Sequence, residues 1–164
     1  MDFPELIESN AVLYETNEFV IALHPEPCVI GHCIIVPKNH YNIIEQIPNN
    51  EFSAMFVAAS KVCTSLFEVL SAQGTNVIIQ NGIAAGQRES RACIHIVPRS
   101  ETDNLPLLWK PKQESEEVMA TVELRYKQEF NQSEEKKVEE KKHHVQEIKN
   151  DEENYMLKHI RRIA

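Results

Sequence analysis

The chain has 164 residues, of which 42% are hydrophobic and 26% charged, and its formal net charge is −8. These values fit a soluble globular protein of about one domain. The negative balance argues against broad binding to polymeric nucleic acid, while a local pocket can still hold one phosphate. The acidic start lacks the regions of a secretory signal, and we find no apolar run near the roughly 18–20 residues that cross a bilayer. We therefore expect a cytoplasmic protein without a membrane partner.

The first strand-like segments form a hairpin in this prediction, because a turn signal at Thr16-Asn17 separates two apolar, β-prone runs. The predicted strands cover residues 11–15, 19–23, 32–36, 75–80 and 92–97. Between the third and fourth strands, apolar residues recur at three- and four-residue steps over 49–72, which predicts an amphipathic helix with an N-cap at Asn49-Asn50. This order predicts an α+β domain with an antiparallel sheet of about five strands.

The C-terminal part of the chain has a different charge pattern. A helical pattern over 115–130 has Glu116 and Glu117 in its first turn, where the helix dipole favours acidic groups. Residues 131–164 hold eight acidic and eight basic side chains, so the net charge of −8 comes from residues 1–130. We predict a domain over 1–112 and a charged helical extension over 113–164, which either frays in water or docks on the core or a partner.

The cysteines favour neither disulfides nor a metal site. They lack C-x-x-C spacing and a secreted context, so we expect free thiols. Cys28 and Cys33 are too few and lie five residues apart, and His143-His144 has no further ligands at suitable spacing. We predict no metal and no cofactor.

Two stretches carry candidate chemistry: Gly31-His-Cys-Ile-Ile-Val-Pro37-Lys38-Asn39-His40, and a later one that runs from Gln80 through Gly82, Gly86 and Gln87 to Arg99. The glycines of the second stretch let backbone amides approach an anion, although most such loops are simple turns.

The strand that follows this loop has polar side chains at every second position. Period-2 alternation places Arg91, Cys93 and His95 on one face, with neighbours ~6.6 Å apart, while Ala92, Ile94 and Ile96 face the core. Such a row suits phosphate. Arg91 offers a forked, charged guanidinium, Cys93 a nucleophile if its pKa is lowered, and His95 a proton donor. A structural role, with Cys93 as a small half-buried filler, is equally open on these residues alone.

These two stretches resemble the histidine-triad superfamily, in particular its prokaryotic and archaeal members and the fragile-histidine-triad-like nucleotidyl hydrolases. Members show G-H-x-x-[hydrophobic]-x-P-K-x-H and then, after a helix, G-x-x-A-G-Q followed by H-x-H-x-H-x-x-P-R. The resemblance covers roughly residues 8–110. It implies an α+β subunit, usually a homodimer, that binds a purine nucleotide or a nucleoside phosphate ester. In active members the middle histidine attacks the α-phosphorus.

Three positions depart from the family pattern. Arg91 replaces the first triad histidine, Cys93 replaces the nucleophile, and His24 stands where the ribose-binding aspartate or asparagine is usual. The candidate site residues are therefore Arg91, Cys93 and His95 for catalysis, and His24, His40, Gln80, Gly86 and Gln87 for the nucleotide and its phosphate.

Three hypotheses follow from these departures. The first is a nucleotide-binding protein with weakened or lost nucleotidyl hydrolase activity. The second is an active nucleotidyl hydrolase or transferase acting on phosphoramidates or dinucleoside polyphosphates, with Cys93 or His95 performing the chemistry and Arg91 lowering the thiol pKa. The third is a dimeric scaffold that binds a protein partner.

Overall fold

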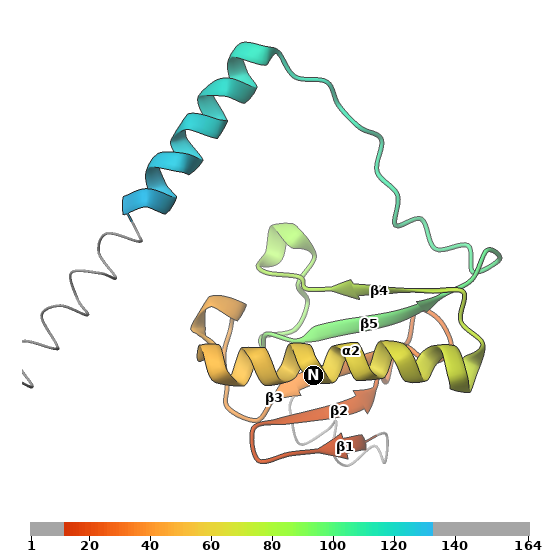
Figure 1. The fold of residues 1–164 in the computed structure, drawn as a ribbon. Helices are drawn as coiled ribbons and strands as arrows, with labels where there is room; N and C mark the ends of the chain where they lie inside the picture. Colours follow the sequence, from red (N-terminus) through yellow and green to blue (C-terminus); the bar gives the residue numbers. More distant parts are fainter. Residues whose placement is uncertain (1–11, 133–164) are drawn as a thin grey trace, which may run out of the picture. The chain divides into compact units, whose positions relative to one another are not determined.

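The computed structural model describes residues 12–132, and the chain divides into two compact units, Met1–Leu107 and Leu108–Ala164. Over residues 12–107, the described part of the first unit, the chain forms one antiparallel sheet of five strands and one long helix (Figure 1). The predicted α+β class, with about five strands and a long helix after the third, is confirmed. The predicted division of roles between 1–112 and 113–164 stays a prediction.

The sheet has the order β1-β2-β3-β5-β4, with every neighbouring pair antiparallel. Its strands are β1 (Val12–Glu15), β2 (Phe19–Leu23), β3 (Cys33–Pro37), β4 (Gly74–Ile78) and β5 (Ile94–Arg99). Thr16 closes the predicted β1–β2 hairpin, because its Oγ1 accepts hydrogen bonds from the amides of Glu18 and Phe19. Two short 3-10 helices that were not predicted, η1 (Ile44–Gln46) and η2 (Ile83–Ala85), shape the loops around the sheet.

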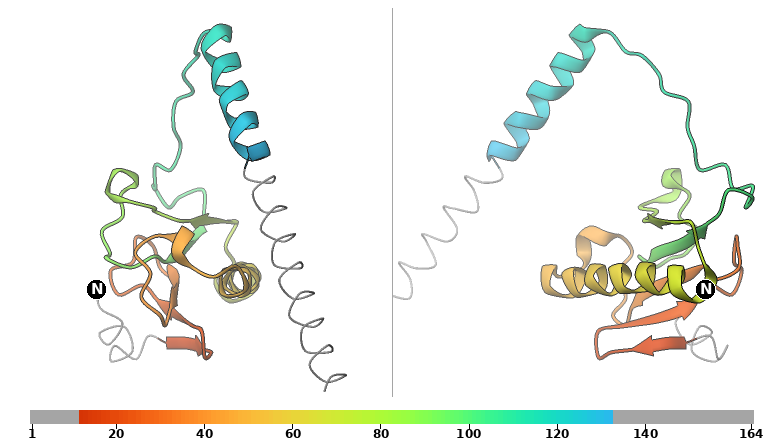
Figure 2. Two further views of the ribbon diagram at one scale, coloured as in Figure 1. Left: turned by 90° about the vertical axis from the view of Figure 1, so that its left-hand side faces the viewer. Right: turned by 45° about the vertical axis from the view of Figure 1, so that its right-hand side comes forward.

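Helix α2 (Asn49–Leu70) packs along one face of the sheet, and Figure 2 shows it end-on beside the strands. Its apolar stripe buries Met55, Ala58, Ala59 and Leu66, which share a core with residues of β3 and β5 such as Ile35, Ile94 and Ile96. The predicted asparagine cap is wrong. Pro48 stands at the N-cap position, and no side chain caps the helix. The carbonyl oxygen of Pro48 accepts a hydrogen bond from the amide of Phe52.

By length and composition, α2 is also a helix that could cross a membrane, which corrects the expectation that no segment of the chain has this property. Core helices of globular proteins pass the same test. Here Met55 is fully buried and Ala59 almost so against the sheet. The helix therefore serves as a core element of the first unit.

The second unit contains a helix over residues 116–132, close to the predicted 115–130. Ser115 caps it, since its Oγ accepts a hydrogen bond from the amide of Val118. The side chains of the described helix are exposed. The predictions for residues 133–164, including His143-His144, fall outside the described residues.

Candidate active site

A pocket of about 430 Å³ lies on the sheet face that α2 leaves open. Ile94 and Ile96 of β5 point into the core beneath α2, so the alternation of the strand turns Cys93 and His95 to the other face. Residues from the β2–β3 connection, from the loop after β4 and from the segment after β5 complete the lining. They are His24, Glu26, Cys28, His32, Ile78, Gln80, Gly86, Gln87, Arg88, Glu89, Cys93, His95, Val97, Leu105 and Leu107.

Six of the eight predicted site residues line this pocket: His24, Gln80, Gly86, Gln87, Cys93 and His95. Arg91 and His40 are absent from its lining. The exposed ring of His40 instead places Nε2 3.0 Å from Asn42 Oδ1. The catalytic and nucleotide-binding roles of all eight stay predictions.

Arg91 does not line the pocket beside Cys93 and His95, and its Nη1 is hydrogen-bonded to the end of β3. Its Nη1 donates hydrogen bonds to the carbonyl oxygens of Pro37 at 2.8 Å, Lys38 at 3.2 Å and Asn39 at 3.0 Å. The physical reason is that Arg91 lies in a bend three residues before β5 begins at Ile94. Strand alternation extends to Cys93, which directly precedes the strand, but does not govern the direction of Arg91. Its guanidinium stabilises the carbonyl groups at the end of β3.

Backbone amides of the loop over residues 82–87 donate hydrogen bonds within the loop. The amide of Ala85 donates to Gly82 O, that of Gly86 to Ile83 O, and that of Gln87 to Gly82 O. The Gln87 side chain is also engaged, since Oε1 accepts from the Gly82 amide at 2.7 Å and Nε2 donates to Asn42 O and Glu89 O. These donors are engaged in supporting the loop.

Gly86 allows Gln80 to reach the pocket wall. Its φ of +87° lies in the left-handed region that favours glycine, and a Cβ there would come 2.9 Å from Gln80 Nε2. The nearby Gly82 also has a positive φ, of +92°, but a Cβ there would meet open space. Gly86 therefore has a packing role that Gly82 lacks.

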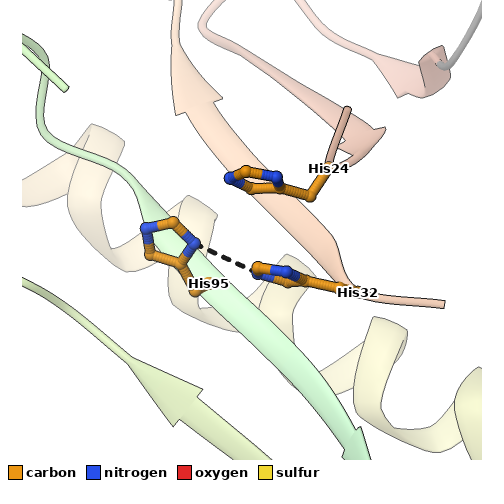
Figure 3. A group of neighbouring side chains, drawn as sticks. All are labelled: His24, His32 and His95. Carbon is orange, nitrogen blue, oxygen red and sulfur yellow. Dashed lines mark hydrogen bonds between the residues drawn. The ribbon is translucent and has the colours of Figure 1, made fainter. Parts of the chain in front are cut away.

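Three histidines converge at the centre of the pocket wall (Figure 3). His24 follows β2, the buried His32 precedes β3, and His95 belongs to β5. The rings of His24 and His32 are stacked, with centroids 4.4 Å apart and planes at 10°. The His95 ring is tilted against both, and its Nδ1 lies 3.2 Å from His32 Nε2.

A chain of contacts fixes which nitrogens carry protons. The amide of Cys28 donates to His32 Nδ1 at 3.4 Å, so the proton of neutral His32 lies on Nε2 and is donated to His95 Nδ1. The proton of neutral His95 must then lie on Nε2, which is 3.2 Å from Cys93 Sγ. In this arrangement the sulfur accepts a hydrogen bond from His95, and His95 is not a base toward the thiol.

Burial keeps this cluster uncharged. It lowers the pKa of His32 to about 4, with further contributions from the charges of His24 and His95. Burial and then His24 also lower the pKa of His95, against an opposing effect of Glu89. Burial and the negative charge of Glu89 raise the pKa of Cys93 to about 11. At neutral pH the wall therefore presents two neutral imidazoles and a neutral thiol.

An ion pair fixes the segment after β5 that contributes Leu105 and Leu107 to the pocket. Arg99 donates from Nε and Nη2 to the two carboxylate oxygens of Asp103, at 2.6 and 3.0 Å, and from Nη2 to Leu105 O. This pairing, with the amides of Leu105 and Ser100, holds the pKa of Asp103 well below its ordinary range. The carboxylate therefore stays charged over the whole neutral range.

His32 lines the pocket, although it is not among the site residues predicted from the sequence. The position of His32 could have indicated this. It lies two residues before Ile34 of β3, which pairs with His95 of the neighbouring strand β5. Two-residue spacing keeps side chains on one face, so His32 and Ile34 share the face of the sheet that carries His95. The register that aligns them is a long-range property and was not predictable from either stretch alone.

Comparison with known proteins identifies the family. The HIT domain model matches residues 7–102. The adenylylsulfatase HINT3 of Arabidopsis thaliana is 33% identical over 93 residues, 57% of this chain and 47% of that protein. The asymmetrical bis(5'-nucleosyl)-tetraphosphatase of Schizosaccharomyces pombe is 27% identical over 101 residues, 62% of this chain and 56% of that protein. The chain thus spans about half the length of these two relatives, whose names describe nucleotide hydrolases.

The same fold occurs in a solved structure. The histidine triad nucleotide-binding protein of Candida albicans superposes with a TM-score of 0.68 at 22% identity, covering 79% of this chain and 96% of that chain. This likeness shows the fold, and the matched HIT domain, which spans more than half of the sequence, shows the family. The chain belongs to the HIT domain family.

Proposed function

We propose that the pocket over β5 binds a purine nucleotide or nucleoside phosphate ester, and that nucleotidyl hydrolysis is weakened or lost. The pocket supports this because it combines apolar walls from Ile78, Leu105 and Leu107 with the polar side chains of Gln80 and His95. The names of the relatives point to the same ligand class. A homodimer and a cytoplasmic location belong to the same proposal.

The state of Cys93 is the observation that carries the proposal. A thiol attacks phosphorus as the thiolate, and burial raises the pKa of Cys93 to about 11. At pH 7 roughly one thiol in ten thousand is ionised at that pKa. Because His95 Nε2 donates to the sulfur in the assigned tautomer, His95 does not take up the thiol proton.

An active enzyme using Cys93 needs a cation to stabilise the thiolate, and Arg91 was the candidate. Its Nη1 is hydrogen-bonded to three carbonyl groups outside the pocket. The acidic Glu89 lines the pocket instead and raises the pKa of Cys93 further. The electrostatics therefore favour nucleotide binding over thiolate catalysis.

The proposal is tested by binding and turnover measured on the same preparations. We expect saturable calorimetric binding of AMP or GMP, with slow or undetectable hydrolysis of adenosine phosphoramidate and diadenosine tetraphosphate. Cys93→His, which restores the family residue at the nucleophile position, should keep nucleotide binding and raise turnover at least about tenfold. Cys63→Ser, on α2 and outside the pocket, is the matched control and should behave like the wild type.

Three results would overturn the proposal. Absence of saturable nucleotide binding would favour the scaffold hypothesis. A covalent nucleotidyl adduct on Cys93, detected by mass spectrometry under turnover conditions, would establish the cysteine enzyme. Robust turnover that survives in Cys93→Ala and disappears in His95→Ala would instead make His95 the essential group.

A further inference from the structure

From the sequence, His24 was placed at the ribose position and His95 among the catalytic residues, while His32 was given no role. The structure brings one ring nitrogen of each to within 4.8 Å of the others (Figure 3). The sequence prediction of no metal rested on cysteine spacing, which does not reveal ligands supplied by three separate segments. We propose that His24, His32 and His95 bind one divalent transition-metal ion of the zinc type.

The distances between the ring nitrogens suit such an ion. Two nitrogens bound to one tetrahedral zinc, each at 2.0–2.1 Å, lie about 3.4 Å apart. His32 Nε2 and His95 Nδ1 are already 3.2 Å apart, so this edge of the tetrahedron is in place. Three imidazoles with a fourth position open to the pocket are a common arrangement for zinc and its neighbours in the transition series.

In two of the three rings, the nitrogen that does not bind the metal lies near a cysteine sulfur that can accept its proton. When His95 binds through Nδ1, its Nε2–H donates to Cys93 Sγ at 3.2 Å. When His32 binds through Nε2, its Nδ1 carries a proton, and Cys28 Sγ lies 3.5 Å away to accept it. Such second contacts fix the tautomer and orientation of metal-binding histidines. Cys93 is an acceptor in this site and not a ligand.

His24 is the ring that must move. It is stacked flat on His32, so its in-plane lone pair does not yet point toward the other two nitrogens. Its Nδ1 accepts a hydrogen bond from the Glu26 amide at 3.0 Å, which is lost when Nδ1 becomes protonated on metal binding. His24 is partly exposed, which gives the ring room to turn. Site formation therefore costs this hydrogen bond and two others, the one from the Cys28 amide to His32 Nδ1 and the one between His32 Nε2 and His95 Nδ1.

The charges around the cluster are mixed. Glu26 and Glu89 line the same pocket and favour a cation, while Arg88 opposes it. His32 is buried, whereas His24 and His95 are both partly exposed, so the ion enters from the side of these two rings. These surroundings are compatible with a divalent ion whose fourth ligand is water or a phosphate oxygen.

Titration of the full chain with Co²⁺ and Zn²⁺, after removal of metals with a chelator, tests the proposal. We expect one equivalent of Co²⁺ to bind with visible d–d bands typical of a nitrogen-rich site, and Zn²⁺ to displace it. His24→Asn should lower the affinity at least about tenfold without unfolding the chain, because His24 is partly exposed. His95→Asn should have the same effect, with circular dichroism as the check on folding.

Two controls separate this site from His40 and from the adjacent histidines His143 and His144. His40→Asn and a double variant of His143 and His144 to asparagine should bind Co²⁺ like the wild type. Loss of the one-equivalent binding in either control, or its retention in His24→Asn and His95→Asn, would overturn the proposal. A near-ultraviolet thiolate charge-transfer band that vanishes in Cys93→Ser would overturn the all-histidine ligand set.

Discussion

His95 Nε2 lies 3.2 Å from Cys93 Sγ, and the contacts behind His95 make the imidazole the donor. The relationship reverses the one needed for a cysteine nucleophile, in which a neighbouring base removes the thiol proton. Burial by the same wall also disfavours the charged form of the sulfur. The position that holds the family nucleophile is therefore occupied by a thiol that resists ionisation.

This state of Cys93 predicts an alkylation profile. Because burial raises the pKa of Cys93 to about 11, its reaction with iodoacetamide should still accelerate about tenfold per pH unit between pH 8 and 10. The rate is measured by mass spectrometry of the Cys93 peptide in metal-free protein, with glutathione in the same buffer as reference. A Cys93 rate that levels off near pH 8 would show a stabilised thiolate and contradict the prediction.

Arg91 offers a second prediction, which separates a structural role from phosphate binding. Arg91→Gln should lower the free energy of unfolding by about 1–3 kcal/mol, because carbonyl groups at the end of β3 lose a charged donor. AMP affinity should stay unchanged, since Arg91 does not line the pocket. Urea denaturation and calorimetry give the two values.

Arg88→Gln is the matched control for Arg91→Gln, because Arg88 is exposed and lines the pocket. It should weaken AMP binding with little change in the free energy of unfolding. An Arg91→Gln protein of normal stability but weakened AMP binding would contradict this prediction and show that Arg91 binds the phosphate.

The two arginine variants illustrate what the sequence could and could not predict. Local patterns were sufficient for α2 and for the core side of β5, since the alternation of Ala92, Ile94 and Ile96 is visible within a few residues and all three are buried. The direction of Arg91 depends on the carbonyls of a strand more than fifty residues earlier in the chain. Such contacts depend on the relative placement of β3 and β5.

The histidine cluster was hidden for the same reason. His24 and His32 flank the connection between β2 and β3, and His95 lies opposite Ile34 on β5. Each residue was visible in the sequence, and two of the three were assigned to the nucleotide site. Their convergence requires the sheet register, which is fixed by the packing of the whole sheet against α2.

The two loop glycines give a third prediction. Gly82→Ala should cost about 1–3 kcal/mol of stability, because φ of +92° with ψ of 161° is a conformation almost confined to glycine. Gly86→Ala, at φ +87° and ψ 12°, should cost less stability but weaken AMP binding more, since its Cβ displaces the Gln80 side chain from the pocket wall. Thermal denaturation and calorimetry on both variants check this. If Gly82→Ala and Gly86→Ala lost AMP affinity equally, the packing role assigned to Gly86 would be contradicted.

His32 gives a fourth prediction, concerning acid stability. Burial, with the charges of His24 and His95, lowers the pKa of His32 to about 4 from its ordinary 6.5. The unfolded chain therefore takes up a proton at a higher pH than the folded chain does. Stability from this group is fully present above pH 6.5 and is lost as the pH falls toward 4. The loss amounts to about 3 kcal/mol at most, as about 1.4 kcal/mol per pKa unit.

Urea denaturation of metal-free protein at pH 7 and pH 4.5 measures this loss. His32→Gln keeps a hydrogen-bonding side chain of similar length but cannot be protonated in this range, so its stability should fall less between the two pH values. His40→Gln replaces an exposed histidine outside the pocket and should retain the wild-type dependence. Because carboxylates also titrate over this interval, the difference between His32→Gln and His40→Gln is the decisive quantity. A difference of zero would mean that His32 is protonated as readily in the folded protein as in the unfolded chain.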